Sequence, residues 1–296
     1  MARHNQVLMY GQVMEGMKVL YNSTDENNKD REIVRIICPI STMRGIREFG
    51  AVDKRIRLDY PIILTQNKKM IELMKTWETG DIVLISGTLA TNNTKILVRC
   101  PNCGHTEQID YMVSFINPIY AKTEAKKLDL NSGNMELRKN AEISNRITII
   151  GKCCMDPITH PTPKGQIITN YQLDVARKYR IKEDDESNKH DFPFVKSYGA
   201  IATNDAKYIK KDAMVFVDGA IQTREYTRKY ECPECGFESQ YITSATEIIP
   251  YATEYLMNCK TPEEVAEEEA HQIEMEGAAA RAAAGLGELN EQPNEY

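Results

Sequence analysis

The chain has 296 residues and a mass of 33.7 kDa, which suits two ordinary domains better than one or three. Hydrophobic residues make up 42% and charged residues 27%, so we expect a globular protein with a packed core. No apolar run approaches the roughly 18 residues of a membrane span, and the N-terminus lacks the apolar stretch of a signal peptide. We therefore expect a cytoplasmic protein, whose cysteines are thiols or metal ligands rather than disulfides.

The formal net charge of −6 hides an uneven distribution. Residues 261–296 carry ten glutamates and one base, whereas the remaining chain carries 36 basic and 33 acidic side chains. This asymmetry is typical of a body that binds polyanions beside an acidic tail. A solubilising acidic helix on an ordinary protein explains the charge equally well.

The chain contains an internal repeat, in which residues 59–118 match residues 191–250 at a constant offset of 132. The matching pairs include Asp59 with Asp191, Gly87 with Gly219, Thr91 with Thr223, Cys100 with Cys232 and Pro118 with Pro250. Gly11 and Gly151 match at an offset of 140, so the copies differ by eight residues in an early loop. A fixed offset over this length predicts two homologous domains.

The second copy has the patterns of strands and one short helix. Alternating apolar residues predict strands over 146–154, 167–179, 192–198, 213–231 and 238–249, and a helical spacing predicts a helix over 205–211. Gly219 inside the long strand indicates a bulge or a sharp bend. Three strands, a helix and two strands form the order of a five-stranded Greek-key barrel, the OB-fold.

The predicted fold is therefore all-β, with two tandem OB-folds followed by an acidic helix and tail. We place the first barrel at 1–125, a linker at 126–144, the second barrel at 145–257 and the acidic segment at 258–296. Thr261, Pro262 and Glu264 form a helix start with a capping box. We expect that helix to run to about Ala284, with a disordered tail from Gly285 onward.

A Cys-Pro-x-Cys-Gly motif occurs once in each copy, at Cys100 and Cys103 and again at Cys232 and Cys235. This is the spacing of a zinc knuckle, but structural zinc takes four ligands and each copy supplies two. We therefore predict one shared zinc site per chain. Redox chemistry is disfavoured because strands flank both motifs; knuckles without metal remain an alternative. The other cysteines are expected to be buried or incidental: Cys38, Cys153, Cys154 and Cys259.

The second copy resembles the bacterial single-stranded DNA-binding protein family. The likeness runs through residues 145–151, 156–157, 170–177 and 205–226, in the family's order. Tyr198 stands where the family usually has tryptophan, the family lacks a Cys-x-x-Cys in its last hairpin, and the chain ends in tyrosine rather than in an aspartate-rich tip closing on phenylalanine.

The resemblance implies a protein that coats and protects single-stranded DNA in replication, recombination or DNA transfer, inside a bacterial or phage-infected cell. It also implies that the acidic segment recruits replication proteins. Two barrels in one chain suggest a phage or mobile-element version, in which a homodimer would replace the family's tetramer.

Single-strand binding needs cations for phosphates and aromatic rings for unstacked bases. The second copy interleaves both, and alternate strand residues share a face, so Arg224, Tyr226 and Arg228 should point one way. The predicted DNA contacts are Arg177, Tyr179, Arg180, Lys196, Tyr198, Arg224, Tyr226, Arg228 and Tyr230, with Arg55, Arg57 and Tyr60 from the first copy.

We do not expect an enzyme, because the sequence shows no phosphate-binding loop, metal helix or nucleophile elbow. Two non-enzymatic alternatives stay open: an accessory protein that loads a helicase in a primosome, and an RNA-binding OB-fold adaptor.

Overall fold

The computed structural model describes residues 4–23, 31–45, 57–163, 165–179 and 190–288. The first half contains β1 (Asn5–Val13), β2 (Lys18–Tyr21), β3 (Ile33–Met43), β4 (Leu58–Asp59), β5 (Ile62–Thr65), α1 (Lys68–Met74), β6 (Ile82–Arg99) and β7 (Thr106–Ala125). Then follow α2 (Leu130–Lys139) and α3 (Ala141–Ser144). The second half contains β8 (Asn145–Cys153), β9 (Ile158–Pro161), β10 (Ile167–Ala176), β11 (His190–Asp191), β12 (Phe194–Tyr198), α4 (Gly199–Tyr208), β13 (Met214–Glu231), β14 (Glu238–Met257) and α5 (Pro262–Glu288).

The two halves of the strand system have the same pairing pattern. In the first half β1 pairs with β3 and β6, β6 pairs with β7, and β5 runs parallel to β7. In the second half β8 pairs with β10 and β13, β13 pairs with β14, and β12 runs parallel to β14. This arrangement, with one helix before the last two strands, is that of the OB-fold. The all-β prediction is confirmed.

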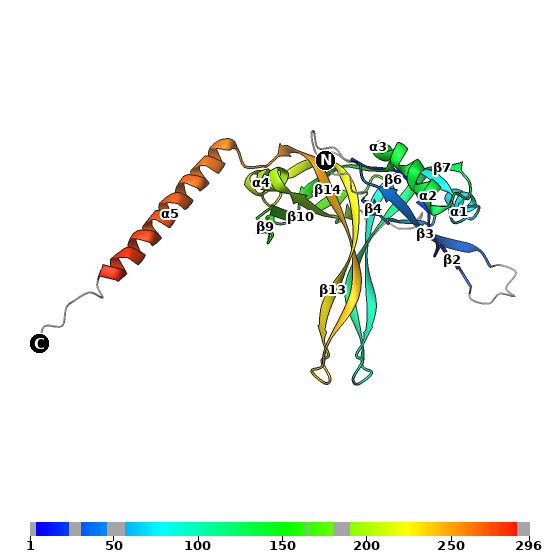
Figure 1. Ribbon diagram of the computed structural model, residues 1–296, viewed down its shortest axis with the longest axis horizontal. Helices are drawn as coiled ribbons and strands as arrows, with labels where there is room; N and C mark the ends of the chain where they lie inside the picture. Colours follow the sequence, from blue (N-terminus) through cyan, green and yellow to red (C-terminus); the bar gives the residue numbers. More distant parts are fainter. Residues whose placement is uncertain (1–3, 24–30, 46–56, 164, 180–189, 289–296) are drawn as a thin grey trace, which may run out of the picture.

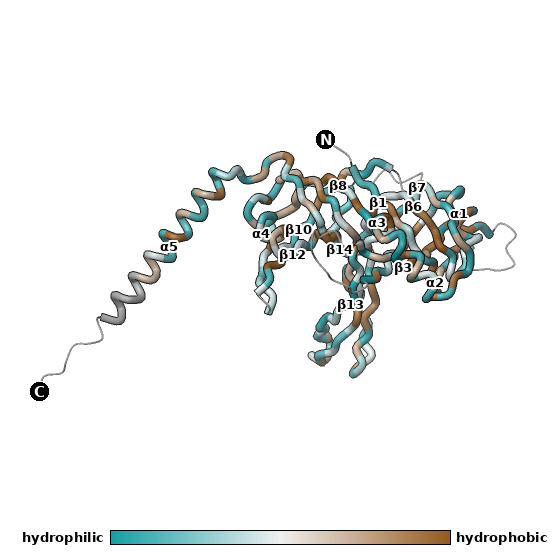
Figure 2. The backbone as a smooth tube through the Cα atoms, turned by 45° about the horizontal axis from the view of Figure 1, so that its top comes forward, coloured by the Kyte–Doolittle hydropathy of each residue, from teal (hydrophilic) through white to brown (hydrophobic). Residues whose placement is uncertain are grey.

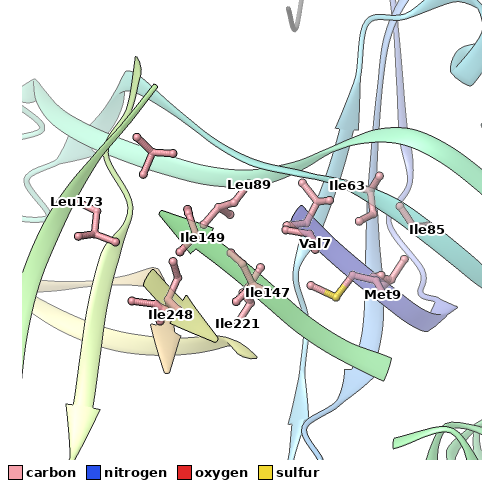
Figure 3. Packing of buried hydrophobic residues seen from close by; sticks show 14 of the residues in the cluster. Val7, Met9, Ile63, Ile85, Leu89, Ile147, Ile149, Leu173, Ile221 and Ile248 are labelled. Atoms are coloured by element: carbon pink, nitrogen blue, oxygen red, sulfur yellow. The ribbon is translucent and has the colours of Figure 1, made fainter. Parts of the chain in front are cut away.

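The core forms because alternate strand residues face inward. Along β8, buried and more exposed residues alternate, and Ile147 and Ile149 are fully buried. They pack with Val7 and Met9 of β1 in a cluster that continues through both halves (Figure 3). Figure 2 shows the corresponding hydrophobic stretches within the strands of the body, most clearly along β6.

The halves join through an antiparallel ladder between β1 and β8. Val7 lies opposite Ile147, and on either side Asn5 lies opposite Ile149 and Met9 opposite Asn145. Because equivalent residues in this part of the chain differ by 140, exchanging the two halves reproduces the same pairs. The halves are therefore related by an approximate two-fold axis at the Val7–Ile147 pair.

Glycines at matching places let the last two strands of each half bend. The β6–β7 register shifts at Gly87, and the β13–β14 register shifts at Gly219, as predicted there. A Cβ at Gly87 would lie 2.4 Å from the carbonyl oxygen of Asn117, and a Cβ at Gly219 would lie 2.3 Å from that of Ile249. The partner backbone thus occupies the space that any side chain would need.

Helix α4 differs from its prediction over 205–211: it begins at Gly199 and ends at Tyr208. Its buried residues are Ala202 and Asp205, and Ile209, which was expected on the apolar face, already has extended backbone. The early start was missed because residues 199–202, Gly-Ala-Ile-Ala, begin with a glycine and show no helical alternation of apolar and polar residues.

The predicted linker contains two helices. Asp129 caps α2 by accepting from the backbone N–H groups of Asn131 and Ser132. Leu137 of α2 is fully buried beside Tyr10 and Ile82 of the first half. The segment is thus a packed part of the first half rather than a bare connection.

Helix α5 begins as predicted. The backbone N–H of Glu264 donates to Thr261 Oγ1 at 3.2 Å, and the Glu264 carboxylate accepts from the Thr261 N–H at 2.7 Å. The helix continues past the predicted end at Ala284 to Glu288. The rest of the expected disordered tail, 289–296, lies outside the described residues.

Candidate nucleic-acid interface and metal centre

Two hairpin arms project from the body and lie side by side (Figure 1). The first arm is residues 91–114 of β6 and β7, and the second arm is residues 223–246 of β13 and β14. Thr91 lies opposite Ser114 at the base of the first arm, and Thr223 lies opposite Thr246 at the base of the second. The offset of 132 therefore lets the two arms be compared residue by residue.

The four motif cysteines meet where the arm tips touch. The sulfur of Cys100 lies 3.7 Å from that of Cys235, and the sulfur of Cys103 lies 3.6 Å from that of Cys232. All four sulfurs lie within 4.8 Å of one another, with Cys100 and Cys232 buried. The two motifs, far apart in sequence, thus form one cluster that could hold a metal ion.

Each tip presents its sulfurs with the same loop. The N–H of Gly104 donates to the Cys100 carbonyl at 3.0 Å, and the N–H of Gly236 donates to the Cys232 carbonyl at 2.9 Å. Both glycines have positive φ, 78° and 67°, which other residues adopt only with strain. The glycine of each motif therefore closes the turn that aims its two cysteines inward.

The environment of Cys235 favours its thiolate. Hydrogen bonds from the backbone N–H of Phe237 and from the Asn102 amide, 3.6 Å from the sulfur, lower the pKa of the Cys235 thiol to about 6. The thiolate is the form of cysteine that binds metals.

Asp59 ties the base of the second arm to the first half. Its Oδ1 accepts from the Thr223 N–H at 2.9 Å, and its other oxygen pairs with Arg44. Thr223 Oγ1 accepts from the N–H of Tyr60 at 2.7 Å. Burial raises the pKa of Asp59, and Arg44 and the Thr223 N–H offset part of that effect. Tyr60 is held beside the arm with 47% of its surface exposed.

Asp191 makes the reciprocal tie from the second half to the first arm. Its Oδ1 accepts from the Thr91 N–H at 2.7 Å, and Thr91 Oγ1 accepts from the N–H of Phe192 at 2.8 Å. Arg177 Nε donates to Asp191 Oδ2 at 2.9 Å, and the Arg177 side chain is only 8% exposed. Arg177 was predicted to contact DNA; the structure instead uses it as an internal partner of a buried carboxylate.

A stack of side chains lines one side of β13. The guanidinium carbons of Arg224 and Arg228 lie 5.2 and 5.6 Å from the centre of the Tyr226 ring. These residues share a face, as the alternation predicts. Glu247 of β14 binds Arg224 through two hydrogen bonds of 2.9 and 2.8 Å. That bidentate pair fixes Arg224, while Arg228 remains exposed.

Strand β12 extends this surface toward the body. Lys196 Nζ lies 6.0 Å from the ring centre of Tyr198. Burial and the charge of Glu247 raise the pKa of Tyr198, while the charges of Arg224, Arg44 and Arg57 lower it. We call this surface the basic aromatic face; it consists of Lys196, Tyr198, Arg224, Tyr226 and Arg228, with Arg57 and Tyr60 of the first half at its edge.

The remaining predicted contacts do not join this face. Strand alternation would place Tyr230 on the same side of β13 as Arg224 and Tyr226. Its side chain is nevertheless only 6% exposed, because near the tip it packs against Val98 and Cys100 of the first arm. Its ring is therefore not available to a base. Tyr179 is 40% exposed, with Lys178 Nζ 5.5 Å from its ring centre. Two further predicted contacts lie outside the described residues: Arg55 and Arg180.

Two of the exposed aromatic residues outside the predicted set lie at or just before β12. Phe192 and Phe194 are 40% and 45% exposed. Phe192 could have been found, because it is the counterpart of Tyr60 at the offset of 132. The repeat gives no signal for Phe194, since Ile62 occupies its matching position, but strand alternation places it on the same face as Lys196 and Tyr198.

One relative is matched over almost its whole length. A protein named single-stranded DNA-binding protein 1 from Clostridium acetobutylicum is 32% identical over 111 residues, which are 36% of this chain and 99% of that protein. The chain belongs to the single-stranded DNA-binding protein family. The model of the single-strand binding protein family matches residues 144–243, which span most of the second half.

Other members of the family are matched over about half of their length. The protein from Oceanobacillus iheyensis is 35% identical over 82 residues, 28% of this chain and 50% of that protein. The protein from Clostridium tetani is 35% identical over 86 residues, 29% of this chain and 57% of that protein.

A family structure from Thermus aquaticus has a similar fold. The crystal structure of its wild-type single-stranded DNA-binding protein superposes with a TM-score of 0.53 at 13% identity, covering 88% of this chain and 96% of that chain. At this identity the likeness concerns the fold alone. Across the described residues, no helix has both the length and the apolar character that crossing a membrane requires.

Proposed function

We propose that this protein binds single-stranded DNA independently of sequence and coats and protects it. The observation that carries the proposal is the basic aromatic face, where Tyr226 lies between two guanidinium groups and Tyr198 lies beside Lys196. Rings that accept any base and cations that accept phosphates are the two components of sequence-tolerant single-strand binding. Membership of the family supports the same role, and binding and protecting a strand requires no catalysed reaction.

Competition between nucleic acids tests this function. A labelled deoxythymidine oligonucleotide bound to the full chain is challenged with unlabelled single-stranded DNA, duplex DNA and RNA of equal length. We expect single-stranded DNA to displace the label at the lowest concentration, because its bases are free to stack. Equal or better displacement by duplex contradicts the proposal, and preferential displacement by RNA supports an RNA-binding adaptor instead.

We propose further that the cysteine cluster holds one structural zinc ion per chain. Four sulfurs about 2.3 Å from a central ion in a tetrahedron are about 3.8 Å from one another. Two pairs of sulfurs across the arms are 3.6 and 3.7 Å apart, and all four lie within 4.8 Å of one another. Cys100, Cys103, Cys232 and Cys235 would supply all four ligands, which leaves no open position for catalysis. Atomic absorption should find about one zinc per purified chain; two or none contradicts a shared site.

The repeat supports two OB-fold domains, which we place at 1–125 and 145–257.

The acidic segment 258–296 is the part we propose for recruiting replication proteins. Lys210 and Lys207 of the second half bind Glu264 and Glu269 near the start of α5. Beyond that contact Ile273 is 71% exposed, as a partner-binding helix requires. Deleting 258–296 should abolish capture of replication proteins while single-strand binding remains.

A further inference from the structure

The approximate two-fold axis gives the molecule two matching faces at the arm bases. The Asp59–Thr223 tie stands beside the second arm, and the Asp191–Thr91 tie stands beside the first. The backbone is therefore placed in the same way where each arm leaves the body. Any difference in what the two faces bind must come from their side chains.

The basic aromatic face has a neutral counterpart. Subtracting 132 from each of its five residues gives an aliphatic or uncharged polar residue at every position. Lys196, Tyr198, Arg224, Tyr226 and Arg228 correspond to Leu64, Gln66, Asn92, Thr94 and Ile96. We call these five counterparts the neutral face.

The first arm does not replace the missing charges on that side. Asn92 and Thr94 are exposed, and Ile96 packs toward the arm tips. The bases Lys95 and Arg99 occur at odd positions, so they point to the opposite side of the strand. Lys95 also lies opposite Asp110 of β7, which balances its charge.

We propose that the two faces are functionally inequivalent: the second arm provides the main grip on the DNA strand, and the matching face of the first arm does not bind it. This inference rests on the proposed single-strand binding and adds where that binding occurs. A base stacked on Tyr226 would have Arg224 and Arg228 within reach of its flanking phosphates. The five side chains of the neutral face carry no ring and no cation of their own. At the edge of that face lie the ring of Phe192, the counterpart of Tyr60, and Arg35 beside Gln66.

Matched double variants of the full chain test the inequivalence. Arg224→Ala with Tyr226→Ala alters the second arm, and Asn92→Ala with Thr94→Ala alters the same positions of the first arm. Each is titrated with a labelled deoxythymidine oligonucleotide at several salt concentrations, after thermal melting has shown that it folds. We expect at least a tenfold loss of affinity and a salt slope lower by about 0.7 for the second-arm variant. We expect less than a twofold change for the first-arm variant.

A reverse graft gives an independent readout. Asn92→Arg with Thr94→Tyr places the second-arm chemistry on the first arm, and both positions are exposed enough to accept it. Affinity should rise at least threefold. The inequivalence would be overturned if the wild type binds and the two alanine variants lose the same amount of affinity. It would also be overturned if the graft does not raise the affinity. Failure of the wild type to bind single-stranded DNA would instead refute the proposed function.

Discussion

At the scale of single residues, the positive charge of Arg224 is neutralised by Glu247. The two side chains form a bidentate pair, and the Glu247 side chain is only 12% exposed. A phosphate that approaches Arg224 must therefore compete with a carboxylate that is already in place.

Glu247→Gln should strengthen single-strand binding by about threefold at low salt, because it removes the negative charge that pairs with Arg224. The gain should shrink as salt is raised. Glu254→Gln is the matched control: it removes the same charge from the same strand, at an exposed site opposite Phe216. Oligonucleotide titrations in which both variants gain equally would argue against a specific role for Arg224.

Asp205 is a second residue whose charge matters, here for stability. It is fully buried and accepts a hydrogen bond of 2.9 Å from the Tyr255 hydroxyl. Burial raises the pKa of Asp205, and the hydroxyl groups around it offset only part of that effect. The folded state thus binds a proton more tightly than the unfolded state does.

The unfolding free energy should therefore fall as pH rises from about 4, the ordinary aspartate value, through the raised folded-state pKa. Asp205→Asn keeps an acceptor for Tyr255 without a titrating proton, so it should flatten this part of the profile. Denaturant unfolding at a series of pH values measures both curves. Parallel curves for variant and wild type would show that Asp205 does not contribute.

At the scale of elements, the long strands owe their bends to the two bulge glycines. Gly219→Ala would force a Cβ to within 2.3 Å of the Ile249 carbonyl, so we expect a loss of stability of about 3 kcal/mol or more. Gly277→Ala is the control, because a Cβ there meets nothing within 4 Å in helix α5. Thermal melting should separate the two; equal melting temperatures would mean that the bend tolerates a side chain.

The long strands of the second half were predictable because their inward residues alternate, and the repeat extended that pattern to the first half. The start of α4 and the packing of α2 were not, since both depend on single residues that meet a distant surface, Ala202 and Leu137. Tertiary contact, rather than local pattern, decides such segments.

The candidate site was only partly predictable for the same reason. The cysteine spacing and the offset of 132 indicated one shared cluster, and alternation placed Arg224 and Tyr226 on one face. Alternation could not reveal that Tyr230 is covered by the first arm. Nor could it show that Arg177 pairs with Asp191, because Asp191 is placed by a contact with the other half, where its Oδ1 accepts from the Thr91 N–H.

At the scale of the whole molecule, the cysteine cluster closes the two arms against each other at their tips. Metal removal should free the tips while the body stays folded. Limited proteolysis after chelation should then show new cleavage within the arms and a lower melting temperature. Cys103→Ser should reproduce this behaviour, whereas Cys154→Ser, outside the cluster, should not. Arms that resist the protease equally with and without metal would contradict a structural role for the ion.

The proposed function requires that the whole molecule presents rings and cations to an unpaired strand. Fluorescence anisotropy of a labelled deoxythymidine oligonucleotide, titrated with the full chain from low to moderate salt, tests it most directly. We expect saturable binding at low salt, with an affinity whose logarithm falls linearly with the logarithm of the salt concentration, and a slope that reflects several phosphate contacts. Anisotropy that stays at the value of the free oligonucleotide at low salt would contradict it.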